Sequence, residues 1–479
     1  MSQKPLSFSF FSKMNKKIIC INIIALFLLT SAASASVVVG INAYKMEKTG
    51  EIESVLINDD KFDGYTLLNP WLSKYTYLIN NTGEVVHSWE SDHFVSLPAY
   101  LLENGNLIRS SAVFSDAFLL QNGCGGRVEM FDWDGNLIWD FTYESDTYVL
   151  HNDIEPLPNG NILMSAWELK TFDEVVAAGV DPNLFLLISD RLLVDYIIEV
   201  EPIFPSGGNI VWEWHVWDHL IQDYDSSKEN YGVVADHPEL LDINFDGRIF
   251  DIIHVNSIDY NETFDQLLIS LRHVSEIWVI DHSTTTVEAA GHSGGNYGKG
   301  GDILYRWGNP QIYDAGDESD QKLFMQHDAR WIEQGCPGEG HITIFNNGCG
   351  RPGGIYSSVE EIIPPMDNMG NYYLETDFTY GPDEAVWSYS TDMYSHFISG
   401  AQRLPNGNTF VCCGVQGHLL EINPANEVVW EYINPYPVPI PVYNSVFKTE
   451  CYPKDYSGIG ELSYSVNSET SELKNSFYS

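Results

Sequence analysis

The chain has 479 residues and a formal net charge of −43, with 24 Lys plus Arg against 67 Asp plus Glu. This deficit of basic residues argues against nucleic-acid binding, which needs a basic face, and makes any anion site a local exception. Hydrophobic residues make up 44% of the chain, and the 27 Tyr, 23 Phe and 13 Trp suit a large core of pleated sheets.

The first segment has the pattern of a secretory signal. A lysine-rich start (13–17) precedes an apolar run (18–29), and small residues suited to cleavage follow near Ala35. We therefore expect residues 1–35 to be a signal peptide and the protein to be secreted or periplasmic. No stable membrane span is expected after cleavage. An uncleaved anchor is the open alternative, although the apolar run is short for a full span.

Two phrases recur through the rest of the chain. The first is an Asn-Gly turn after an apolar strand, seen in LLENGNLI (101–108), PLPNGNILM (156–164) and QRLPNGNTF (402–410). The second is a hairpin whose last strand ends in Trp, seen in YLINNTGEVVHSW (77–89), VEMFDWDGNLIWDF (128–141) and LLEINPANEVVWEY (419–432). Asn-Gly and Asp-Gly supply the positive φ angles that tight hairpins need. Each unit is therefore a meander of short antiparallel strands.

About six such units, each of roughly 65 residues, predict an all-β fold, a six-bladed β-propeller with a central funnel site. A β-sandwich array is the structural alternative. The propeller should span 40–450, with 170–250 as a rim insertion and 456–479 as a disordered, Ser-rich tail. The expected hub strands lie near Tyr65, Leu101, Leu157, Ile258, Trp331 and Arg403.

Residues 251–281, DIIHVNSIDYNETFDQLLISLRHVSEIWVID, predict a hairpin with a turn at 261–265. His254 and Arg272 lie equally far from the middle of that turn, so antiparallel pairing places them side by side. A cation beside an imidazole makes a pocket for an oxyanion. His273 should point to the opposite face, away from this pocket.

Two further histidines precede hub strands in the same way, His151 in HNDIEPL and His327 in QHDARW. His396, in YSHFISGAQ, precedes another hub strand, and it and Asn256 are candidate substrate-binding residues. For any one of these histidines, a strand-capping role is the alternative. The group lacks the carboxylate pair of a glycosidase, and Arg272 would repel the metal of a three-histidine zinc site. Positioned cations suit sulfuryl or phosphoryl transfer, and a neutral imidazole can hold the moving group covalently.

These motifs resemble those of the PAPS-independent aryl-sulfate sulfotransferases, exported enzymes with a six-bladed propeller. The resemblance covers roughly residues 60–435 and rests on HNDIEPLPNGN, HVNSIDY…LLISLRHVSEI and QHDARW. It implies that His327 is sulfated as a covalent intermediate and that Arg272 is the cationic clamp. It also implies that His151 and His254 bind sulfuryl oxygens or move protons. The reaction implied is ping-pong transfer from a phenolic sulfate donor to a phenol acceptor, without a nucleotide cofactor or a metal. A homo-oligomer is compatible with the sequence.

Other functions stay open at this stage. A non-enzymatic propeller could bind an anionic or carbohydrate ligand in the same funnel. A quinoprotein-like oxidoreductase and a metal-dependent hydrolase are further alternatives.

Several local patterns carry separate expectations. Cys336 and Cys349 flank a short segment of a chain expected to be exported and are the best disulfide candidates, with free thiols as the alternative. DINFDGRIFD (242–251) imitates a calcium loop but lacks its final acidic residue, which favours a plain Asp-Gly turn. His215 and His219 are four residues apart and would share one face of a helix, although a rim loop with partly buried histidines is the favoured interpretation.

Overall fold

The computed structural model describes residues 56–113, 125–184, 191–245, 251–375, 378–390, 394–436 and 444–459. The expected signal peptide, Cys124, the middle of the calcium-like loop and residues 460–479 lie outside the described residues.

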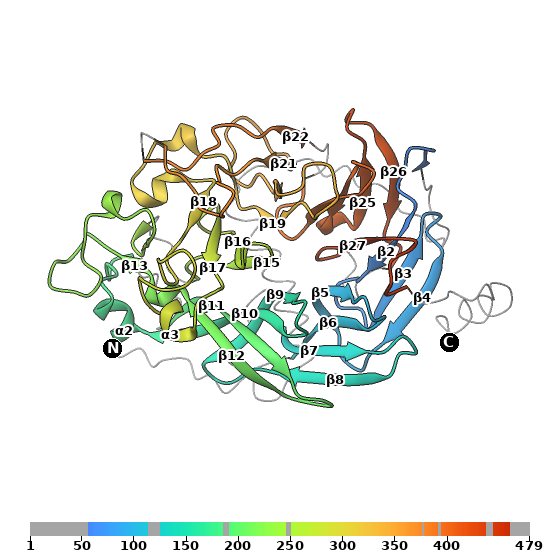
Figure 1. Cartoon of the computed structure of the whole chain (residues 1–479), viewed down its shortest axis with the longest axis horizontal. Helices are drawn as coiled ribbons and strands as arrows, with labels where there is room; N and C mark the ends of the chain where they lie inside the picture. Colours follow the sequence, from blue (N-terminus) through green and yellow to red (C-terminus); the bar gives the residue numbers. More distant parts are fainter. Residues whose placement is uncertain are drawn as a thin grey trace, which may run out of the picture.

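Six antiparallel sheets radiate from a central axis, so the fold is the predicted six-bladed β-propeller (Figure 1). Blade 1 comprises β27 (Glu450–Pro453), β2 (Gly64–Leu68), β3 (Tyr75–Asn80) and β4 (Val85–Glu90). Blade 2 comprises β5 (Val95–Leu101), β6 (Leu107–Ala112), β7 (Gly126–Phe131) and β8 (Leu137–Thr142). Blade 3 comprises β9 (Tyr148–Pro156), β10 (Ile162–Thr171), β11 (Arg191–Pro202) and β12 (Gly208–His215).

The remaining blades follow in chain order. Blade 4 comprises β15 (Val255–Asn261), β16 (Gln266–Leu271), β17 (Glu276–Asp281) and β18 (Tyr305–Trp307). Blade 5 comprises β19 (His327–Trp331), β20 (Ile342–Asn346), β21 (Ser358–Ile362) and β22 (Trp387–Ser390). Blade 6 comprises β23 (Gly400–Arg403), β24 (Thr409–Cys413), β25 (His418–Ile422), β26 (Val428–Ile433) and β1 (Leu56–Ile57).

The recurring Asn-Gly turns join the first and second strands of blades 2, 3 and 6. Gly105, Gly160 and Gly407 have φ angles of 87°, 88° and 89°. Each donates its amide hydrogen to the carbonyl three residues before it, at 2.9 Å. A residue with a Cβ would be strained at these angles, which explains why glycine recurs there.

The recurring tryptophans join neighbouring blades. The indole Nε1 of an outer-strand tryptophan in each blade donates a hydrogen bond to the next blade around the ring, at 2.7–3.0 Å. The six residues are Trp89, Trp139, Trp214, Trp307, Trp387 and Trp430. The second recurring phrase therefore encodes contacts between blades as well as strands within them.

The hub strand of blade 1 differs from the prediction. Tyr65 lies in β2, the second strand of that blade, and pairs with Tyr452 of the innermost strand β27. The ring thus closes because β27, from the C-terminal part of the chain, pairs with β2, from its N-terminal part. A second N-terminal strand, β1, pairs with β26 of the last blade. Sequence order alone could not reveal this, because the closing strand comes from the far end of the chain. Such closure removes free sheet edges.

Residues 170–250 are only partly a rim excursion. They contain α2 (Phe172–Ala177), which Thr171 and Glu174 cap reciprocally, and also the blade strands β11 and β12. The excursion proper, 216–245, carries the turn η2 (Val216–Asp218) and a small parallel pair, β13 (Leu220–Ile221) and β14 (Leu241–Asp242). At the other end of the chain, the expected tail begins with a packed residue, since Tyr456 donates a hydrogen bond to the carbonyl oxygen of Leu101.

Candidate active site

Three hub strands carry a histidine toward the same end of the propeller axis. His151 lies within β9, His254 directly precedes β15, and His327 begins β19. The ring centroids of His151 and His254 are 4.7 Å apart, and His254 and His327 are close enough to affect each other's protonation. The structure therefore brings together the three histidines that the sequence singles out.

Each of these histidines lies at an irregularity of its hub strand. The pairing register between the hub strand and its neighbour shifts there in all three blades. Asn152, His254 and Asp328 have left-handed backbone, with φ angles of 51°, 56° and 52°. Left-handed non-glycine residues are uncommon, and bulges of this kind turn side chains out of the regular strand alternation. The phrase after each histidine thus encodes the bend that aims the imidazole.

His254 is held in one tautomer by its neighbours. Its Nδ1 lies 2.6 Å from Asp251 Oδ2, and its Nε2 lies 3.3 Å from the Asn152 amide nitrogen. Because a carboxylate accepts and an amide nitrogen donates, Nδ1 carries the hydrogen and Nε2 presents a lone pair. Burial, and then the charge of Arg272, lower the pKa of His254 to about 3. His254 is therefore a neutral, oriented base at neutral pH.

His151 lies behind His254 in an enclosed place. Its side chain is fully buried, its ring stacks on Trp167 with centroids 3.4 Å apart, and its Nδ1 lies 3.3 Å from Asp195 Oδ1. The Asp195 carboxylate also accepts the backbone amides of His254 and Val255, at 3.1 and 3.0 Å. Burial lowers the pKa of His151 well below its usual value. Asp195 therefore links the two histidines of blades 3 and 4.

His327 is held in one tautomer by Asn347. Its Nδ1 lies 2.8 Å from Asn347 Oδ1. The Asn347 amide nitrogen donates to the carbonyls of Ser395 and Ile398 at 2.7 and 3.0 Å, so the orientation of the amide is fixed and Oδ1 is an acceptor. Nδ1 of His327 therefore carries the hydrogen, which leaves Nε2 with its lone pair. Burial, followed by the charge of Arg272, lowers the pKa of His327 well below its usual value.

Arg272 supplies the positive charge of this group. Its backbone amide donates to the carbonyl of His254 at 3.1 Å, so the hairpin places the two residues side by side as expected. Its Nε is buried and has no hydrogen-bond partner among the described residues. Burial lowers the pKa of Arg272, while the nearby Cys349 and Asp251 raise it. A buried guanidinium nitrogen without a partner is costly, which suits a site that receives an anion.

The two candidate substrate-binding residues lie in different settings. His396 is half-buried, its ring lies 4.7 Å from that of Phe397, and its pKa is lowered by burial and by Arg272. His396 therefore lies near the positive charge of Arg272. Asn256 instead donates to the carbonyl of Gln326 at 2.7 Å, while its Oδ1 is buried without a partner in the described part of the chain. This bond links the start of blade 5 to blade 4.

Strand alternation predicts that His273 points away from the site, but the structure places it beside His254. Its ring centroid lies 4.8 Å from that of His254, and its Nδ1 donates to the carbonyl of Asp251 at 2.9 Å. Strand β16 ends at Leu271, so His273 belongs to the following turn, where alternation no longer holds. Asp251, His254 and His273 together offer three metal-ligating atoms, although the charge of Arg272 beside them opposes a cation.

The proposed disulfide is absent, because Cys336 and Cys349 are both free thiols. Cys336 lies in the turn between β19 and β20, whereas Cys349 lies beyond the other end of β20. A five-residue strand spans ~17 Å, too far for a disulfide. Cys349 is instead part of the site, with its Sγ 3.1 Å from the carbonyl oxygen of His396 and 3.2 Å from the hydroxyl of Tyr394.

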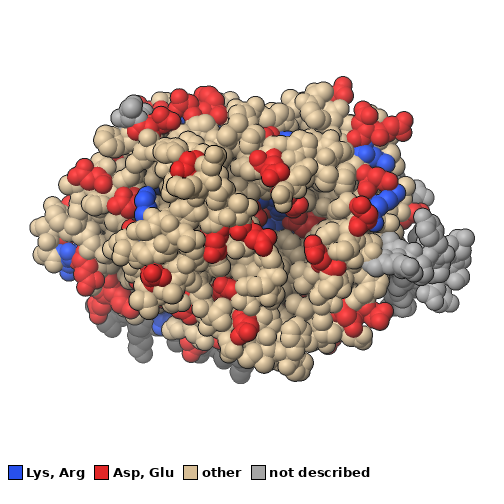
Figure 2. Space-filling view, in the orientation of Figure 1, with Lys and Arg blue, Asp and Glu red and all other residues tan. Residues whose placement is uncertain are grey.

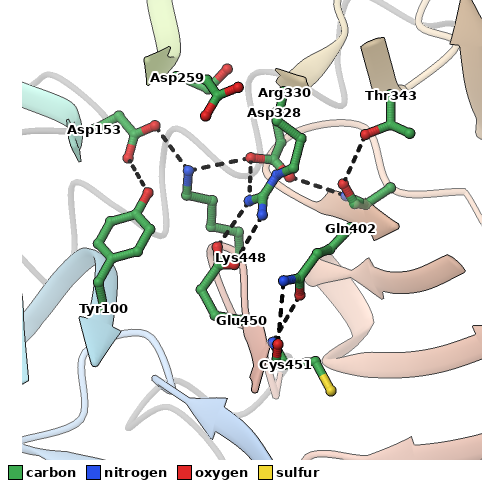
Figure 3. Close-up of polar contacts among 12 residues, drawn as sticks. Tyr100, Asp153, Asp259, Asp328, Arg330, Thr343, Gln402, Lys448, Glu450 and Cys451 are labelled. Atoms are coloured by element: carbon green, nitrogen blue, oxygen red, sulfur yellow. Dashed lines mark hydrogen bonds and ion pairs between the residues drawn. The ribbon is translucent and has the colours of Figure 1, made fainter. Parts of the chain in front are cut away.

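A layer of charged side chains lies between the hub strands (Figure 3), and its Asp328, Arg330 and Lys448 line a cavity. The Lys448 ammonium lies 2.9 Å from Asp153 Oδ2 and 3.2 Å from Asp328 Oδ1, and Arg330 bridges Asp328 and Glu450. This cavity has a volume of about 780 Å³. Its lining comes from the far ends of the hub strands that carry the histidines, including Glu155, Asp259 and Arg330. None of the three histidines lines this cavity, so it is not the place where they meet.

Comparison with known proteins places the chain in a family. The family model for arylsulfotransferase (ASST) matches residues 51–435. The chain belongs to the arylsulfotransferase family. No curated protein matches it significantly. Among solved structures, a Bacteroides caccae protein of unknown function has a TM-score of 0.42 and 12% identity, covering 81% of this chain and 99% of that one. Virginiamycin B lyase from Staphylococcus aureus has a TM-score of 0.35 and 9% identity, covering 82% and 91%.

Family membership supports aryl sulfotransferase activity and phenolic substrates. The motifs that carry the resemblance contain His151, His254, Arg272 and His327, which the structure brings together. Acidic side chains are widespread on the face in Figure 2, and a hollow near its centre contains both acidic and basic side chains. In the part of the chain that is described, none of the helices combines the length and apolar character needed to cross a membrane.

Sequence reasoning missed the residues that orient this arylsulfotransferase site. Asp251 lies within the opening phrase of the hairpin, and Asn152 directly follows His151, so both could have been suspected from their positions. Asn347 and Asp195 are contributed by β-strand regions outside the histidine phrases. Asn347 holds His327 from the end of the neighbouring strand of blade 5, whereas Asp195 of blade 3 holds His254 of blade 4, and only the three-dimensional structure shows both contacts.

Proposed function

We propose that the protein transfers a sulfuryl group from a phenolic sulfate ester to a phenol by a ping-pong mechanism, with His327 as the covalent carrier. The single observation that carries this proposal is the placement of His327 beside Arg272. Asn347 holds the Nδ1 hydrogen of His327, which leaves the lone pair on Nε2, and the neighbouring Arg272 has a buried Nε without a partner among the described residues. A neutral nucleophile beside an anion-binding cation is what attack on a sulfate ester requires.

In the first half-reaction, the sulfate oxygens of the donor bind at Arg272. His327 Nε2 attacks sulfur, the N–S bond forms, and the bond between sulfur and the aryl oxygen breaks. The aryl oxygen departs as a phenolate, which takes up a proton from water. Asp251 keeps the Nε2 lone pair of His254 ready for the next half-reaction through its 2.6 Å contact with Nδ1.

In the second half-reaction, a phenol replaces the first product. His254 Nε2 accepts the phenolic proton while the phenol oxygen attacks sulfur, and the N–S bond breaks. His327 then returns to its neutral form with the hydrogen on Nδ1. His254 then passes the phenolic proton to water, so atoms and charges balance over the cycle. His151 and Asp195 maintain the placement of His254, and no nucleotide or metal enters either step.

Export is part of the proposal, and it rests on the signal pattern of residues 1–35. Mass spectrometry of the protein recovered outside the cytoplasm of an expressing bacterium should find a new N-terminus near Ala35. Recovery in the cytoplasm with an intact N-terminus would contradict export.

A mass spectrum tests the covalent step. The purified protein is exposed briefly to 4-nitrophenyl sulfate without a phenol acceptor, at mildly alkaline pH where a sulfo-imidazole survives. We expect release of nitrophenol and an added sulfuryl mass on the peptide that contains His327. His327→Ala should abolish both signals, and Arg272→Ala should weaken them sharply.

His237→Ala is the matched control, because that histidine is exposed on the rim and contacts Glu239. It should label as the wild type does. Normal turnover by His327→Ala would contradict the mechanism. Tight binding of aryl sulfates without nitrophenol release would favour the alternative of a propeller that only binds anions.

A further inference from the structure

A second group of histidine and aspartate side chains lies away from the hub. His219 follows η2 in the 216–245 excursion, while His292 and Asp302 belong to the glycine-rich segment between α3 (Thr286–Ala289) and β18. His219 Nδ1 and His292 Nδ1 each lie 2.8 Å from the same oxygen, Asp302 Oδ1. The donor atoms of the three side chains all lie within 4.8 Å of one another.

The surroundings of His219 fix its tautomer. Its Nε2 lies 2.8 Å from the carbonyl oxygen of Ala289, which can only accept, so Nε2 carries a hydrogen. Nδ1 of the neutral ring would then face a carboxylate oxygen with a lone pair, at 2.8 Å. A positive species, either a second proton or a metal ion, must occupy that contact. Metal-binding histidines commonly donate their other ring N–H to a backbone carbonyl in this manner.

We propose that His219, His292 and Asp302 bind a divalent transition-metal ion, with Zn²⁺ as the best match. Two imidazoles and one carboxylate suit Zn²⁺ and its neighbours better than Mg²⁺ or Ca²⁺, which prefer oxygen ligands. His219 and Asp302 side chains are 1% and 8% exposed, whereas that of His292 is 62% exposed. The site is therefore closed on the protein side and open on the other, where water completes the coordination.

The geometry needs only a small adjustment to hold the ion. Ligand atoms around four-coordinate zinc lie ~3.3 Å apart, so each 2.8 Å contact must lengthen by ~0.5 Å. The exposed ring of His292 can make this movement by rotation. His219 is more firmly placed, because its ring stacks on Trp214 and a Cβ at Gly301 would lie 2.6 Å from its Nε2.

The ion would connect the 216–245 excursion to blade 4. His219 follows the last strand of blade 3, and Asp302 precedes the last strand of blade 4. The Trp214 indole already joins these blades through the carbonyl of Gly301, at 2.7 Å. The expected role of the metal is therefore structural, and its ligands are separate from those assigned to sulfuryl transfer.

The pairing of His215 with His219 on one helical face is not found. Residues 216–218 form a 3-10 turn, and the two rings have different partners. His215 Nδ1 lies 3.1 Å from Glu168 Oε1 of blade 3. The spacing of four residues thus predicts no contact between His215 and His219. The neighbours of His219 are instead Asp302 and His292, from a later segment of the sequence.

Zinc titration of the metal-stripped protein by calorimetry, together with its metal content by mass spectrometry, tests this site. We expect one Zn²⁺ per chain. Because loss of supporting contacts alone weakens metal sites by ~10–100-fold, His292→Ala and Asp302→Asn should each weaken binding at least ~10-fold. His292 is exposed, so His292→Ala should fold, which circular dichroism checks.

Two further variants locate the bound ion. His237→Ala removes another exposed histidine of the same excursion and should leave the zinc affinity unchanged. His273→Ala disrupts the other possible ligand group, that of Asp251 and His254, and should also leave one Zn²⁺ bound. Absence of zinc binding in the wild type, unchanged affinity in His292→Ala, or loss of binding only in His273→Ala would overturn the proposal.

Discussion

His327 Nδ1 lies 2.8 Å from Asn347 Oδ1, and this contact determines which nitrogen of the ring can react. Replacing Asn347 by Leu removes the acceptor and frees the ring to adopt the other tautomer, with its hydrogen on Nε2. We expect kcat for 4-nitrophenyl sulfate to fall roughly 10²-fold, since loss of a tautomer-fixing partner is costly in comparable nucleophilic sites. Nitrogen-15 NMR of the histidines would report the tautomer directly.

Asn347→Asp is the matched variant for that prediction. It keeps an acceptor oxygen toward His327 Nδ1 but loses the donors to Ser395 and Ile398. It should therefore keep the Nδ1–H tautomer and lose less activity than Asn347→Leu. Equal losses in both variants would mean that Asn347 acts by holding the 395–398 segment rather than by orienting the ring.

Arg272 should matter for both binding and chemistry. Arg272→Gln removes the positive charge that faces the sulfate oxygens, and we expect kcat/KM to fall about 10²–10³-fold, as for the loss of a preorganised anion-stabilising donor. The same charge contributes to the lowered pKa of His254, His327 and His396, so these histidines should become easier to protonate in the variant. Histidine titration followed by NMR would detect that change.

Arg403→Gln provides a control for a general loss of charge. Arg403 lies at the far cavity and pairs with Glu361. Its replacement should leave kcat/KM within about twofold of the wild type, because exposed or distant charges contribute little to chemistry across a protein. A loss as large as that of Arg272→Gln would imply that overall electrostatics rather than local contact governs activity.

The rate should depend on the protonation of Asp251. Burial raises the pKa of Asp251 to about 6. As the pH falls through this value, the carboxylate takes up a proton and can no longer accept the hydrogen of His254 Nδ1. The group is needed in its ionised form, so activity should be present above about pH 6 and be lost below it.

Measuring kcat/KM across roughly pH 5 to 8 checks this dependence. Asp251→Asn cannot ionise, so its rate should be lower at neutral pH and should lack this acid limb. If the wild type and Asp251→Asn show the same acid limb, another group controls the rate. The low pKa of His254, about 3, excludes that residue as the source of a limb near pH 6 in the free protein.

The repeated phrases made much of the fold predictable from the sequence. Each Asn-Gly turn and each outer-strand tryptophan has a local physical cause, a positive φ angle or an indole that must find an acceptor. The histidines and Arg272 could also be found. The histidines precede hub strands in similar phrases, and counting residues from the hairpin turn pairs His254 with Arg272. Closure through β27 could not, since its partner strand lies almost 400 residues earlier.

The orienting residues were hidden for a similar reason. Asp195 acts across blades 3 and 4, whereas Asn347 holds a histidine on the neighbouring strand of its own blade, and the strands of both carry no unusual pattern. The left-handed residues at 152, 254 and 328 also break the alternation on which side-chain directions were predicted. Sequence patterns thus predicted which histidines and arginine come together better than which residues hold them.

The charged layer across the axis should be a major determinant of stability. Lys448 is 3% exposed and contacts both Asp153 and Asp328. Although burial alone would lower the pKa of Lys448, these carboxylates hold it above its usual range. Lys448→Met preserves volume but leaves the buried Asp153 carboxylate without its cation and Asp328 paired with Arg330 alone. We expect the free energy of unfolding in urea to fall by about 3–5 kcal/mol.

Two comparisons separate the buried charge from the loss of any lysine. Lys454→Met removes a pair with Asp63 in which the side chains are 56% and 63% exposed, and it should cost less than about 1 kcal/mol. Adding Asp153→Asn to Lys448→Met removes the uncompensated charge and should restore part of the stability. If Lys448→Met unfolds at the same urea concentration as the wild type, the layer does not hold blade 1 to its neighbours through these ion pairs.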